Sequence, residues 1–575
     1  MSGLRTLPQM LDAAARTDAG VTFLVNGLEV RRTYAELQYS SYCFARALRD
    51  AGFSRGDLVA LVLPDAEEFL TALFGASIAG IVPASVHPPA TTGDLKQYFE
   101  ITASTLESSR ARGLVTNIAL APGFSGLHPR CRDLQRVLVL GELAAPPIAD
   151  RDIDPPSIDD LAFVQFTSGS TAVPKGVALT HRNVAANVEA ISGPDGLDTG
   201  ASDVAVTWLP LSHDMGLVGM TIGAVNARRP VVIMTPQAFV KRPSDWLRAI
   251  SRYRGTISFA PTFGYDLCVR RLKERDLVGL DLSCWRVAGC GAEPIHAPTL
   301  VAFARRLASI GFKSSSLLPS YGLAEHVVAA TFAPCGRSPI VENIAAESAG
   351  LDGPAVIATG EDGPIVEVVS CGRPFRGHEL RIVGSDGRPL PERHVGEIVL
   401  RGPSVMLGYY RQDALTAQTI RDEWLYTGDL GYLAGGDLFV CGRAKDIFIV
   451  NGRKYHPQDL EWAVESLAGV RRGRVVAFGM PEAGRPDRVV IVLEPNGTVP
   501  AETLIDSIRR RIGDRFGLSL DAVAFVPAGT VGRTTSGKVQ RAATKARYER
   551  GEFRNSELGI RNLELVPNSQ FRIPI

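Results

Sequence analysis

Net charge is almost absent from this 575-residue sequence, in which 62 lysines and arginines balance 61 aspartates and glutamates. Proteins that bind nucleic acid or an anionic membrane surface usually concentrate positive charge, because they must neutralise phosphates. A net charge of +1 therefore gives no reason to expect either partner. The composition is otherwise that of an ordinary globular protein, with 45% hydrophobic and 21% charged residues.

Cysteine is scarce and scattered, with eight residues and no C-x-x-C pair. Closely spaced cysteines would indicate a zinc site, and a dense set in a short chain would indicate a disulfide framework. Neither pattern is present, so we expect a cytoplasmic protein whose cysteines stay reduced. The eight are Cys43, Cys131, Cys268, Cys284, Cys290, Cys335, Cys371 and Cys441.

Long hydrophobic runs are also missing. Residues 1–20 lack the apolar core of a signal peptide. The segment from Phe69 to Val86 is uncharged, but it is barely long enough to span a bilayer, and Gly80 and Pro83 interrupt it. We expect a buried helix through Ile78 followed by a buried strand, and no transmembrane segment.

The chain is too long for a single hydrophobic core, so we expect at least two domains. Residues 1–160 alternate helix-like and strand-like stretches, as in Tyr34–Ala51 and then Leu58–Leu63, which favours an α/β fold with a mainly parallel sheet. Short strands with turn signals predict a small β-rich subdomain at about 370–443. We expect a large N-terminal domain at 1–444, with two α/β subdomains plus the β-rich one, and a smaller α+β domain at 445–575.

The stretch from Leu161 to His181 changes character abruptly. Two short apolar runs, each typical of a buried strand, flank five small residues at Thr167–Thr171 and a Pro-Lys-Gly sequence centred on Lys175, and a helix is predicted to open at the end. Small residues let a backbone close around an anion, and hydroxyl and amide groups donate to its oxygens. The simpler alternative is a polar hairpin turn. The P-loop of mononucleotide-binding proteins is excluded, because Gly rather than Ser or Thr follows the lysine.

Three further motifs contain polar residues that suit a nucleotide site. His213 follows a strand predicted at Val204–Leu211, although a histidine there is often only a helix cap. Tyr321 lies between small residues and can stack on a purine, while Glu325 can hold Mg²⁺ or serve as a helix N-terminal acid. Asp429 follows Thr-Gly, where it could accept from a ribose diol or be a plain turn residue.

Taken in order, these motifs resemble those of the AMP-forming adenylating enzymes, the superfamily of acyl-CoA synthetases, luciferases and peptide-synthetase adenylation domains. The resemblance covers roughly residues 20–545 and implies a large adenylating domain with a mobile C-terminal domain. It implies two catalytic residues: His213 beside the acyl carboxylate, and Lys538 in the sequence TTSGKVQR. A lysine in such a loop is otherwise usually a surface charge. Lys445 matches the hinge about which the C-terminal domain rotates.

The same resemblance implies ATP and Mg²⁺ as cofactors, with Glu325 and Thr167 at the metal. It implies that Tyr321 stacks on adenine and that Asp429 and Arg443 contact the ribose. The full set of nucleotide-binding residues that it implies is Thr167, Ser168, Gly169, Ser170, Thr171, Lys175, Gly291, Ala292, Glu293, Ser320, Tyr321, Gly322, Asp429 and Arg443.

Several stretches resemble one branch of the superfamily, the fatty acyl-AMP ligases, more closely. They include Tyr265–Arg271, Val369–Pro374 and the HDMGL sequence that begins at His213. The long segment between Glu325 and Gly372 lies where these ligases carry an insertion that acyl-CoA synthetases lack. The resemblance implies that this insertion restrains the C-terminal domain.

This narrower resemblance implies that a medium- or long-chain fatty acid is activated by ATP to an acyl-adenylate with release of pyrophosphate. The acyl group would then pass to an acyl carrier protein or a polyketide synthase carrier domain. Two departures from the ligase pattern, Ser212 in place of the usual Phe and the sequence Phe259–Phe263, fall near the expected acyl tunnel. The alternatives are an acyl-CoA synthetase and, in a different class, a non-catalytic acyl-adenylate-binding protein. A non-catalytic protein should lack the catalytic lysine, whereas Lys538 is present here.

Overall fold

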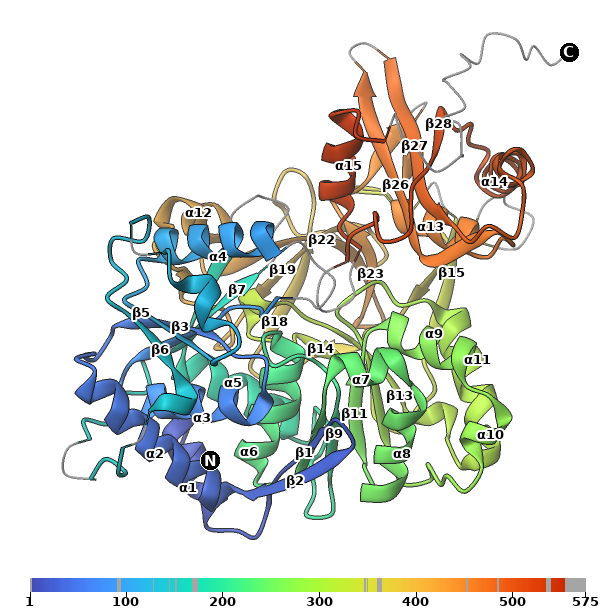
Figure 1. Ribbon diagram of the computed structural model, residues 1–575. Coiled ribbons are helices and arrows are strands. Elements are labelled where there is room, and N and C mark those ends of the chain that lie inside the picture. Colours follow the sequence, from blue (N-terminus) through green and yellow to red (C-terminus); the bar gives the residue numbers. More distant parts are fainter. Residues whose placement is uncertain are drawn as a thin grey trace, which may run out of the picture.

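The computed structural model describes residues 3–89, 95–127, 129–143, 145–149, 153–167, 174–345, 348, 350–358, 365–450, 453–482, 485–533 and 539–553. The chain forms a large N-terminal part, coloured from blue to gold, on which a smaller orange and red C-terminal part is stacked (Figure 1). The N-terminal part is built on two large sheets.

The first sheet has seven strands in the order β20-β8-β7-β4-β3-β5-β6. Strands β3 to β7 run parallel, whereas β8 and β20 are antiparallel to their neighbours. Its strands are β3 (Leu58–Val62), β4 (Val82–Ser85), β5 (Gly113–Thr116), β6 (Arg136–Val139), β7 (Leu161–Thr167), β8 (Lys175–Thr180) and β20 (Gly408–Tyr409). The helices that accompany it in the sequence are α2 (Tyr34–Asp50), α3 (Ala66–Ile78) and α4 (Leu95–Ser109).

The second sheet has nine strands in the order β17-β14-β13-β12-β11-β9-β10-β1-β2, and the six from β13 to β1 run parallel. Its strands are β1 (Gly20–Val25), β2 (Leu28–Thr33), β9 (Ala205–Thr207), β10 (Val231–Met234), β11 (Ile257–Ala260), β12 (Val287–Cys290), β13 (Leu317–Tyr321), β14 (Thr331–Phe332) and β17 (Arg373–Pro374). The associated helices are α1 (Leu7–Ala15), α5 (His181–Ser192), the π-helix η4 (Met215–Ile222), α6 (Gly223–Ala227), α7 (Pro236–Lys241), α8 (Ser244–Tyr253), α9 (Thr262–Arg271), α10 (Glu274–Leu277) and α11 (Ala297–Leu307).

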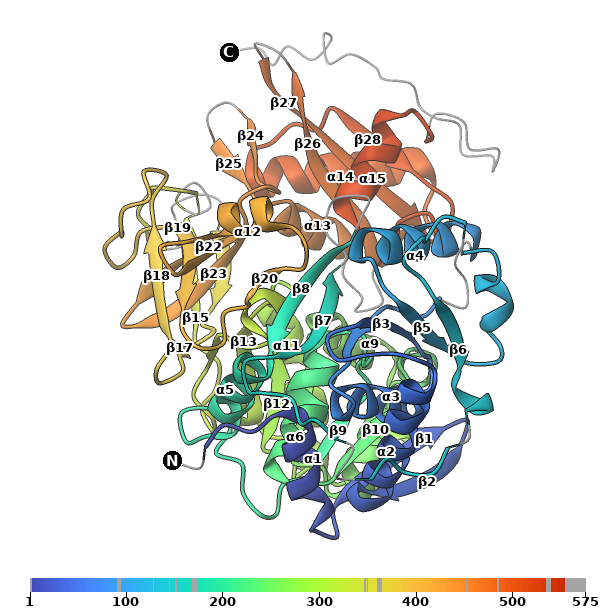
Figure 2. The ribbon, with the colours of Figure 1, turned by 90° about the vertical axis from the view of Figure 1, so that its left-hand side faces the viewer.

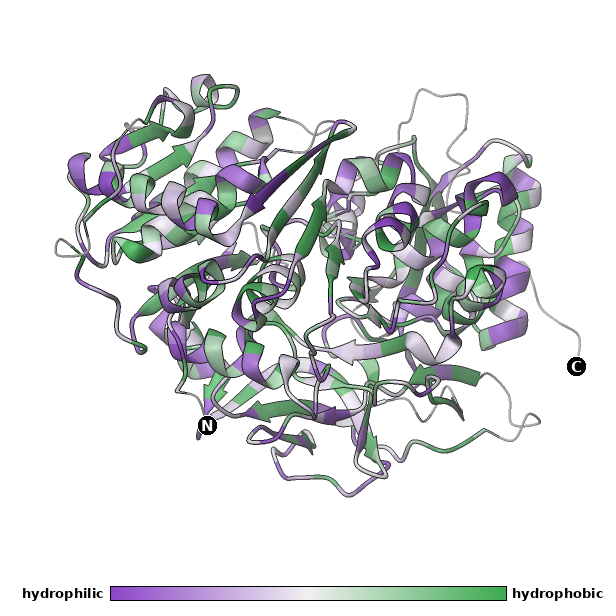
Figure 3. Cartoon of the chain, turned by 90° about the horizontal axis from the view of Figure 1, so that it is seen from below, coloured by the Kyte–Doolittle hydropathy of each residue, from purple (hydrophilic) through white to green (hydrophobic). Residues whose placement is uncertain are grey.

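One hydrophobic core is shared by the two sheets. Its largest fully buried side chains include Trp208, Trp246 and Trp285, and Trp246 makes edge contacts to the other two at 6.1 and 5.0 Å between ring centroids. Edge-to-face contacts of this kind add to the gain from burying such large rings. The hydropathy colouring shows the same division, with mostly hydrophobic strands inside and helices of mixed character around them (Figure 3). This rigid base supports the loops at the strand ends.

A β-rich region follows the second sheet in the chain. Its five-stranded sheet contains β18 (Glu379–Val383), β19 (Gly396–Arg401), β21 (Ile420–Arg421), β22 (Trp424–Ala434) and β23 (Asp437–Arg443), and α12 (Asp413–Thr419) precedes β21. A separate hairpin pairs β15 (Val341–Ala345) with β16 (Ile365–Val369), and its inner side chains share a small core with β22 and β23.

The C-terminal part has its own hydrophobic cores on both faces of a three-stranded sheet. The sheet consists of β26 (Val470–Glu482), β27 (Arg485–Pro495) and β28 (Ala522–Phe525), preceded by the hairpin β24 (Phe448–Val450) and β25 (Arg453–Tyr455). Its helices are α13 (Pro457–Glu465), α14 (Ala501–Phe516) and α15 (Arg541–Glu549). Figure 2 shows this part above both the α4 side and the β-rich region of the N-terminal part.

The expected α/β fold with mainly parallel sheets is confirmed. The apolar segment that begins at Phe69 forms helix α3 as far as Ile78 and then β4, as predicted. Helix α5 opens at His181 with Thr180 as its cap, through a mutual pair of bonds between Thr180 and Asn183. Within the part of the chain that the structure describes, no helix combines the length and apolarity needed to cross a membrane.

One expected strand is wrong in its extent. The stretch Val204–Leu211 was expected to be extended throughout, but β9 covers only Ala205–Thr207. The following residues form a turn, in which the Leu209 N–H donates to the Thr207 hydroxyl at 3.1 Å. Pro210 has no N–H to contribute to a ladder, so a central strand cannot continue through it.

Candidate active site

Many of the residues that the motifs indicate lie at the ends of β7, β9, β12 and β13 or in the segments that follow them. Because parallel strands direct their carboxyl ends to one edge of a sheet, side chains that follow them can converge there. The two sheets meet at this edge, since the Gln165 side-chain amide of β7 donates to the Ser212 carbonyl oxygen beyond β9 at 3.4 Å.

Tyr321, Asp429 and Arg443 form one hydrogen-bonded group. The Tyr321 hydroxyl donates to Asp429 Oδ2 at 2.8 Å, and Arg443 Nε lies 3.2 Å from Asp429 Oδ1. Asp429 and Arg443 are opposite each other on the paired strands β22 and β23. Burial raises the pKa of Tyr321 well above its usual range, and the neighbouring carboxylate raises it further. The hydroxyl therefore stays protonated and remains a donor.

Glu325 and Lys175 meet at Tyr409, a residue that the motifs did not indicate. The Tyr409 hydroxyl donates to Glu325 Oε1 at 2.8 Å, and Lys175 Nζ lies 5.1 Å from the Tyr409 ring centroid. Tyr409 belongs to the two-residue strand β20, where it is paired with Val177 of β8. The Met406 N–H also donates to the Glu325 carbonyl oxygen at 2.9 Å, so this segment holds Glu325 at two points.

The glycines of two motifs permit a close approach of backbone segments. A Cβ atom on Gly291 would lie 2.6 Å from Ser320 Oγ, and one on Gly322 would lie 1.9 Å from the Val328 carbonyl oxygen. No side chain fits at such distances, so glycine is required at both positions. Ser320 donates to the Cys290 carbonyl oxygen at 3.1 Å and thereby joins the two motifs.

Ala292 and Glu293 form a tight turn after β12. Ala292 has φ of +68°, a left-handed conformation that residues with a side chain seldom adopt. The Glu293 carboxylate accepts from the Phe263 N–H at 2.6 Å and so joins this turn to the start of α9. The Arg533 guanidinium of the C-terminal part lies 5.8 Å from the Phe263 ring centroid.

Two further contacts join the C-terminal part to the α9 and α11 side of the site. The rings of Trp462 and His296 lie 4.5 Å apart, and Arg472 Nη1 lies 3.9 Å from Asp266 Oδ1. Both pairs flank the turn that contains Glu293. The C-terminal part therefore contacts the segments on both sides of this turn.

The β15–β16 hairpin, with the loop that joins its strands, lies where the resemblance implies an insertion, and it also contacts the C-terminal part. Lys454 Nζ donates to the Leu351 carbonyl oxygen at 2.6 Å, and a Cβ atom on Gly350 would lie 2.2 Å from the Lys454 side chain. Ile447, just beyond β23, packs against the core that the insertion shares with the β-rich sheet. These contacts lie close to Lys445, which is exposed in the turn between β23 and β24.

The expected phosphate loop is framed by β7 and β8. Thr167 ends β7, and its hydroxyl donates to the Lys175 carbonyl oxygen on the paired strand at 3.4 Å. Asn183, at the start of α5, donates to the carbonyl oxygens of Pro403 and Val405, which fixes the segment leading to β20. The expected site residues Ser168, Gly169, Ser170, Thr171 and Lys538 lie outside the described residues.

His213 belongs to a separate group of polar residues. Its Nδ1 lies 2.6 Å from Asp214 Oδ1, which also accepts from the Met215 N–H at 2.7 Å where η4 begins. The Ser212 hydroxyl lies 2.6 Å from Nδ1 of His87, a residue at the end of β4 that the motifs did not indicate. The structure thus places His213 at the start of η4, beside the first sheet.

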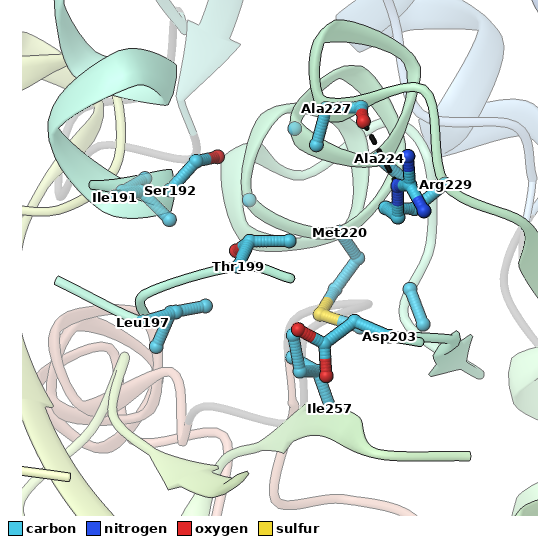
Figure 4. A pocket seen from close by; sticks show the side chains of 13 residues that line it. Ile191, Ser192, Leu197, Thr199, Asp203, Met220, Ala224, Ala227, Arg229 and Ile257 are labelled. Carbon is cyan, nitrogen blue, oxygen red and sulfur yellow. Dashed lines mark hydrogen bonds between the residues drawn. The ribbon is translucent and has the colours of Figure 1, made fainter. Parts of the chain in front are cut away.

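A small hollow lies toward the other end of the η4–α6 segment (Figure 4). Its apolar lining includes Ile191, Leu197, Met220 and Ile257. On the helical side, the lining residues have small side chains or none, namely Gly219, Gly223, Ala224 and Ala227. Figure 4 shows the side chains of Met220 and Asp203 directed toward this space. Ser192, Thr199, Asp203 and Arg229 add polar groups to the lining, and the η4–α6 segment connects this hollow to His213.

Comparison with known proteins gives consistent matches over nearly the whole chain. Residues 11–410 match the family described as AMP-binding enzyme, and residues 445–557 match the Disco-interacting protein 2-like AMP domain. A Caulobacter vibrioides protein provisionally named an acyl-CoA synthetase is 36% identical over 95% of this chain and 96% of its own length. A Moorena producens medium-chain-fatty-acid–[acyl-carrier-protein] ligase is 33% identical over 94% of both chains.

A solved structure from a study of fatty acyl-adenylate ligases from E. coli and L. pneumophila superposes with a TM-score of 0.90 and 35% identity. The match covers 96% of this chain and 100% of that one. The resemblance drawn from the motifs is confirmed by these matches. The chain belongs to the AMP-binding enzyme family.

Proposed function

We propose that the protein activates a fatty acid with ATP to form an acyl-adenylate and then passes the acyl group to the thiol of an acyl carrier protein. The observation that carries this proposal is the Tyr321–Asp429–Arg443 group, which we call the nucleotide cluster. It joins an aromatic ring to a buried carboxylate at the edge where both sheets end. Relatives named as ligases of fatty acids support the substrate class.

The nucleotide cluster has the groups that an adenosine needs. The Tyr321 ring can stack on adenine, and its hydroxyl orients the Asp429 carboxylate, which can accept from the ribose hydroxyls. Gly291 packs closely against Ser320 and Gly322 against the Val328 carbonyl oxygen, and without side chains their backbone can face the purine edge. Ala292 and Glu293 would complete this wall of the nucleotide site.

The phosphates would lie over Thr167–Thr171 and Lys175. Glu325 and the Thr167 hydroxyl offer oxygen ligands, which Mg²⁺ prefers, and Glu325 is held for that role by Tyr409. These residues therefore fit the metal that the family implies. When bound, Mg²⁺ would supply positive charge to the phosphates.

In the reaction, one oxygen of the fatty carboxylate attacks the α-phosphorus of ATP, the bond to the bridging oxygen breaks, and pyrophosphate leaves. Catalysis of this type rests on positioning and on stabilising charge. We assign His213 to orienting the carboxylate and Lys538 to the oxygens that gain charge. The acyl chain would run along the apolar η4–α6 segment toward the hollow of Figure 4.

The contacts of the insertion favour a carrier protein over CoA as acceptor. We propose that the C-terminal domain begins at residue 445 and rotates about Lys445 before thioester formation. Lys454 and Ile447, which lie just beyond that hinge, are held by the insertion in the pose described here. A carrier protein can offset this restraint through its own surface contacts, whereas CoA is too small to do so. An acyl-CoA synthetase is the alternative, favoured by the Caulobacter relative.

The test uses the full chain with ATP, Mg²⁺ and decanoic acid, and follows pyrophosphate release and the acyl products by chromatography. Without an acceptor, we expect acyl-adenylate to accumulate. When a phosphopantetheine-bearing carrier protein is added, we expect an acyl thioester on that carrier, and when CoA is added, we expect little acyl-CoA. Abundant acyl-CoA would establish the alternative. No pyrophosphate release with any fatty acid would indicate the non-catalytic binding protein.

A single-residue variant separates the restraint from the chemistry. Lys454→Ala removes one hydrogen bond between the insertion and the C-terminal part, a contact worth about 0.5–1.5 kcal/mol. We expect acyl-CoA formation to rise by a few-fold while adenylation is spared. Lys313→Ala, at an exposed lysine of the N-terminal part, is the matched control and should change neither activity. An unchanged acyl-CoA yield in Lys454→Ala would remove the insertion from the explanation.

A further inference from the structure

A second cluster of polar residues lies between the two sheets, next to His213. It consists of Ser85 on β4, Gln165 on β7, Ser212 after β9 and His87 after β4, and we call it the acyl-side cluster. Ser85 and Gln165 are direct partners in the parallel pair β4–β7, so their side chains emerge on the same face of the sheet. Ser85, Gln165 and Ser212 are 2%, 3% and 6% exposed.

Two atoms of this cluster have no hydrogen-bond partner among the described residues. They are the Ser85 hydroxyl and Oε1 of Gln165. Burying such an atom without a hydrogen-bond partner costs about 1–3 kcal/mol, so native proteins rarely leave one unsatisfied. Besides each other, their neighbours on the first sheet include Leu61 and Phe163, whose apolar side chains offer no hydrogen-bonding group.

The bonds of Gln165 fix which kind of group it needs. Its amide contacts the Ser212 carbonyl oxygen at 3.4 Å, and a carbonyl oxygen can only accept, so the NH₂ end of the amide points there. The other end, Oε1, is an acceptor and requires a donor. A methylene chain offers no donor, and neither does a keto oxygen, whereas a hydroxyl group does. The Ser85 hydroxyl can donate to or accept from the same group.

The position of the cluster sets where that hydroxyl would be on the substrate. Ser212 directly precedes His213, which the proposed function places beside the carboxylate, and the Ser212 hydroxyl is held by His87 at 2.6 Å. Gln165 is two residues before Thr167, where the expected phosphate loop begins. The cluster is therefore at the reacting end of the acyl path. The distal hollow of Figure 4 lies toward the other end of the η4–α6 segment, away from this cluster.

We propose that the acyl-side cluster selects carboxylic acids that carry a hydroxyl group on the second or third carbon. The hydroxyl donates to Gln165 Oε1 and exchanges a hydrogen bond with Ser85. This inference rests on the proposed function and names the substrate class of the same site. Sites built to bond a substrate hydroxyl discriminate strongly against analogues without it, because the buried polar groups are then left unpaired.

The test compares decanoic acid with 2-hydroxydecanoic and 3-hydroxydecanoic acid in pyrophosphate release, with kcat/KM as the readout. We expect the wild type to favour at least one hydroxy acid by about tenfold or more. Gln165→Leu and Ser85→Ala should each bring that ratio close to one. Ser77→Ala is the matched control: Ser77 has another buried hydroxyl without a described partner, but it lies on α3, so the ratio should keep its wild-type value.

The outcomes separate this inference from the proposed function. Equal kcat/KM for plain and hydroxy acids in the wild type would overturn the inference and leave fatty-acid activation standing. A ratio that Gln165→Leu and Ser85→Ala do not change would also overturn it, because the cluster would then serve only to position His213. No release with any of the three acids would overturn the proposed function itself. Thermal unfolding checks that each variant is folded. If Gln165→Leu does not fold, the kcat/KM ratio of Ser85→Ala alone decides between these outcomes.

Discussion

The nucleotide cluster and the acyl-side cluster differ in how their polar atoms are occupied. In the nucleotide cluster, the Asp429 carboxylate already bonds the Tyr321 hydroxyl and the Arg443 guanidinium. In the acyl-side cluster, the Ser85 hydroxyl and the Gln165 amide oxygen bond none of the described residues. The difference follows charge, because a buried ion without a partner costs several kcal/mol, whereas a neutral polar atom costs about 1–3 kcal/mol.

A nucleotide that engages Asp429 must share or replace bonds that already exist, so its gain is the difference between two sets of bonds. A substrate hydroxyl that reaches Gln165 gains a bond where there was none. Charge should therefore decide affinity for ATP, and hydrogen-bond count should decide the choice of acid. The following variants test each half of that division.

The largest loss of activity is expected from Lys538→Ala, which leaves both clusters intact. It removes the lysine that we propose stabilises the negative charge that develops during adenylation. Deleting one such charge-stabilising donor typically lowers kcat by ~10²-fold or more. ATP binding, measured by calorimetry, should be retained. Fatty-acid-dependent pyrophosphate exchange close to the wild-type rate would show that Lys538 has no catalytic part.

Asp429→Asn should have the next largest effect, because it removes the charge of the nucleotide cluster while keeping its shape. Hydrogen bonds to charged groups contribute about 1.5–3 kcal/mol, so we expect KM for ATP to rise by about tenfold or more. KM for the fatty acid should change little. Tyr321→Phe is the comparison variant and should have a smaller effect, since it removes one neutral donor. Equal effects on both substrates would mean that Asp429 only holds the fold.

Glu325→Gln should weaken Mg²⁺ binding by several-fold, because it replaces a charged oxygen ligand with a neutral one. Binding of Mn²⁺ in the presence of ATP, followed by electron paramagnetic resonance, measures this directly alongside the Mg²⁺ dependence of activity. Tyr409→Phe keeps the carboxylate and removes only the bond that orients it, so its effect should be smaller. If Glu325→Gln binds Mn²⁺ as well as the wild type, Glu325 is a structural acid.

Local patterns in the sequence predicted much of the fold, and they indicated residues that the structure brings together. Helix α5 begins at His181 as expected because its cap lies in adjacent residues. Tyr321, Asp429 and Arg443 were each indicated by a motif, and the structure brings them together. The predicted extent of β9 was wrong because the apolar residues of Val204–Leu211 suit a strand, whereas Pro210 within that stretch cannot continue one.

The residues that were missed depend on contacts between distant segments. Tyr409 lies on a strand of two residues, too short for any periodic signal, and it joins β8 from far along the chain. Ser85 and Gln165 lie in strands that are otherwise largely apolar, so the pattern indicates core strands and does not reveal that the two polar side chains share one face of the sheet. Only the register between β4 and β7 shows it.

The smallest effect is expected from pH, and it concerns His87 in the acyl-side cluster. Burial, together with the nearby His213, lowers the pKa of His87 to about 4, although Asp214 opposes the shift. A base whose pKa is lowered to about 4 is neutral above that pH, so His87 does not change its charge between pH 5.5 and 8. The ratio of kcat/KM for 3-hydroxydecanoic and decanoic acid should therefore be flat over this range. Because both acids are measured in the same buffers, effects of pH on shared groups cancel in the ratio. A ratio that falls on acidification with a midpoint near 6.5, the ordinary value for histidine, would mean that His87 takes up a proton there, and the acyl-side cluster would then discriminate by charge as well.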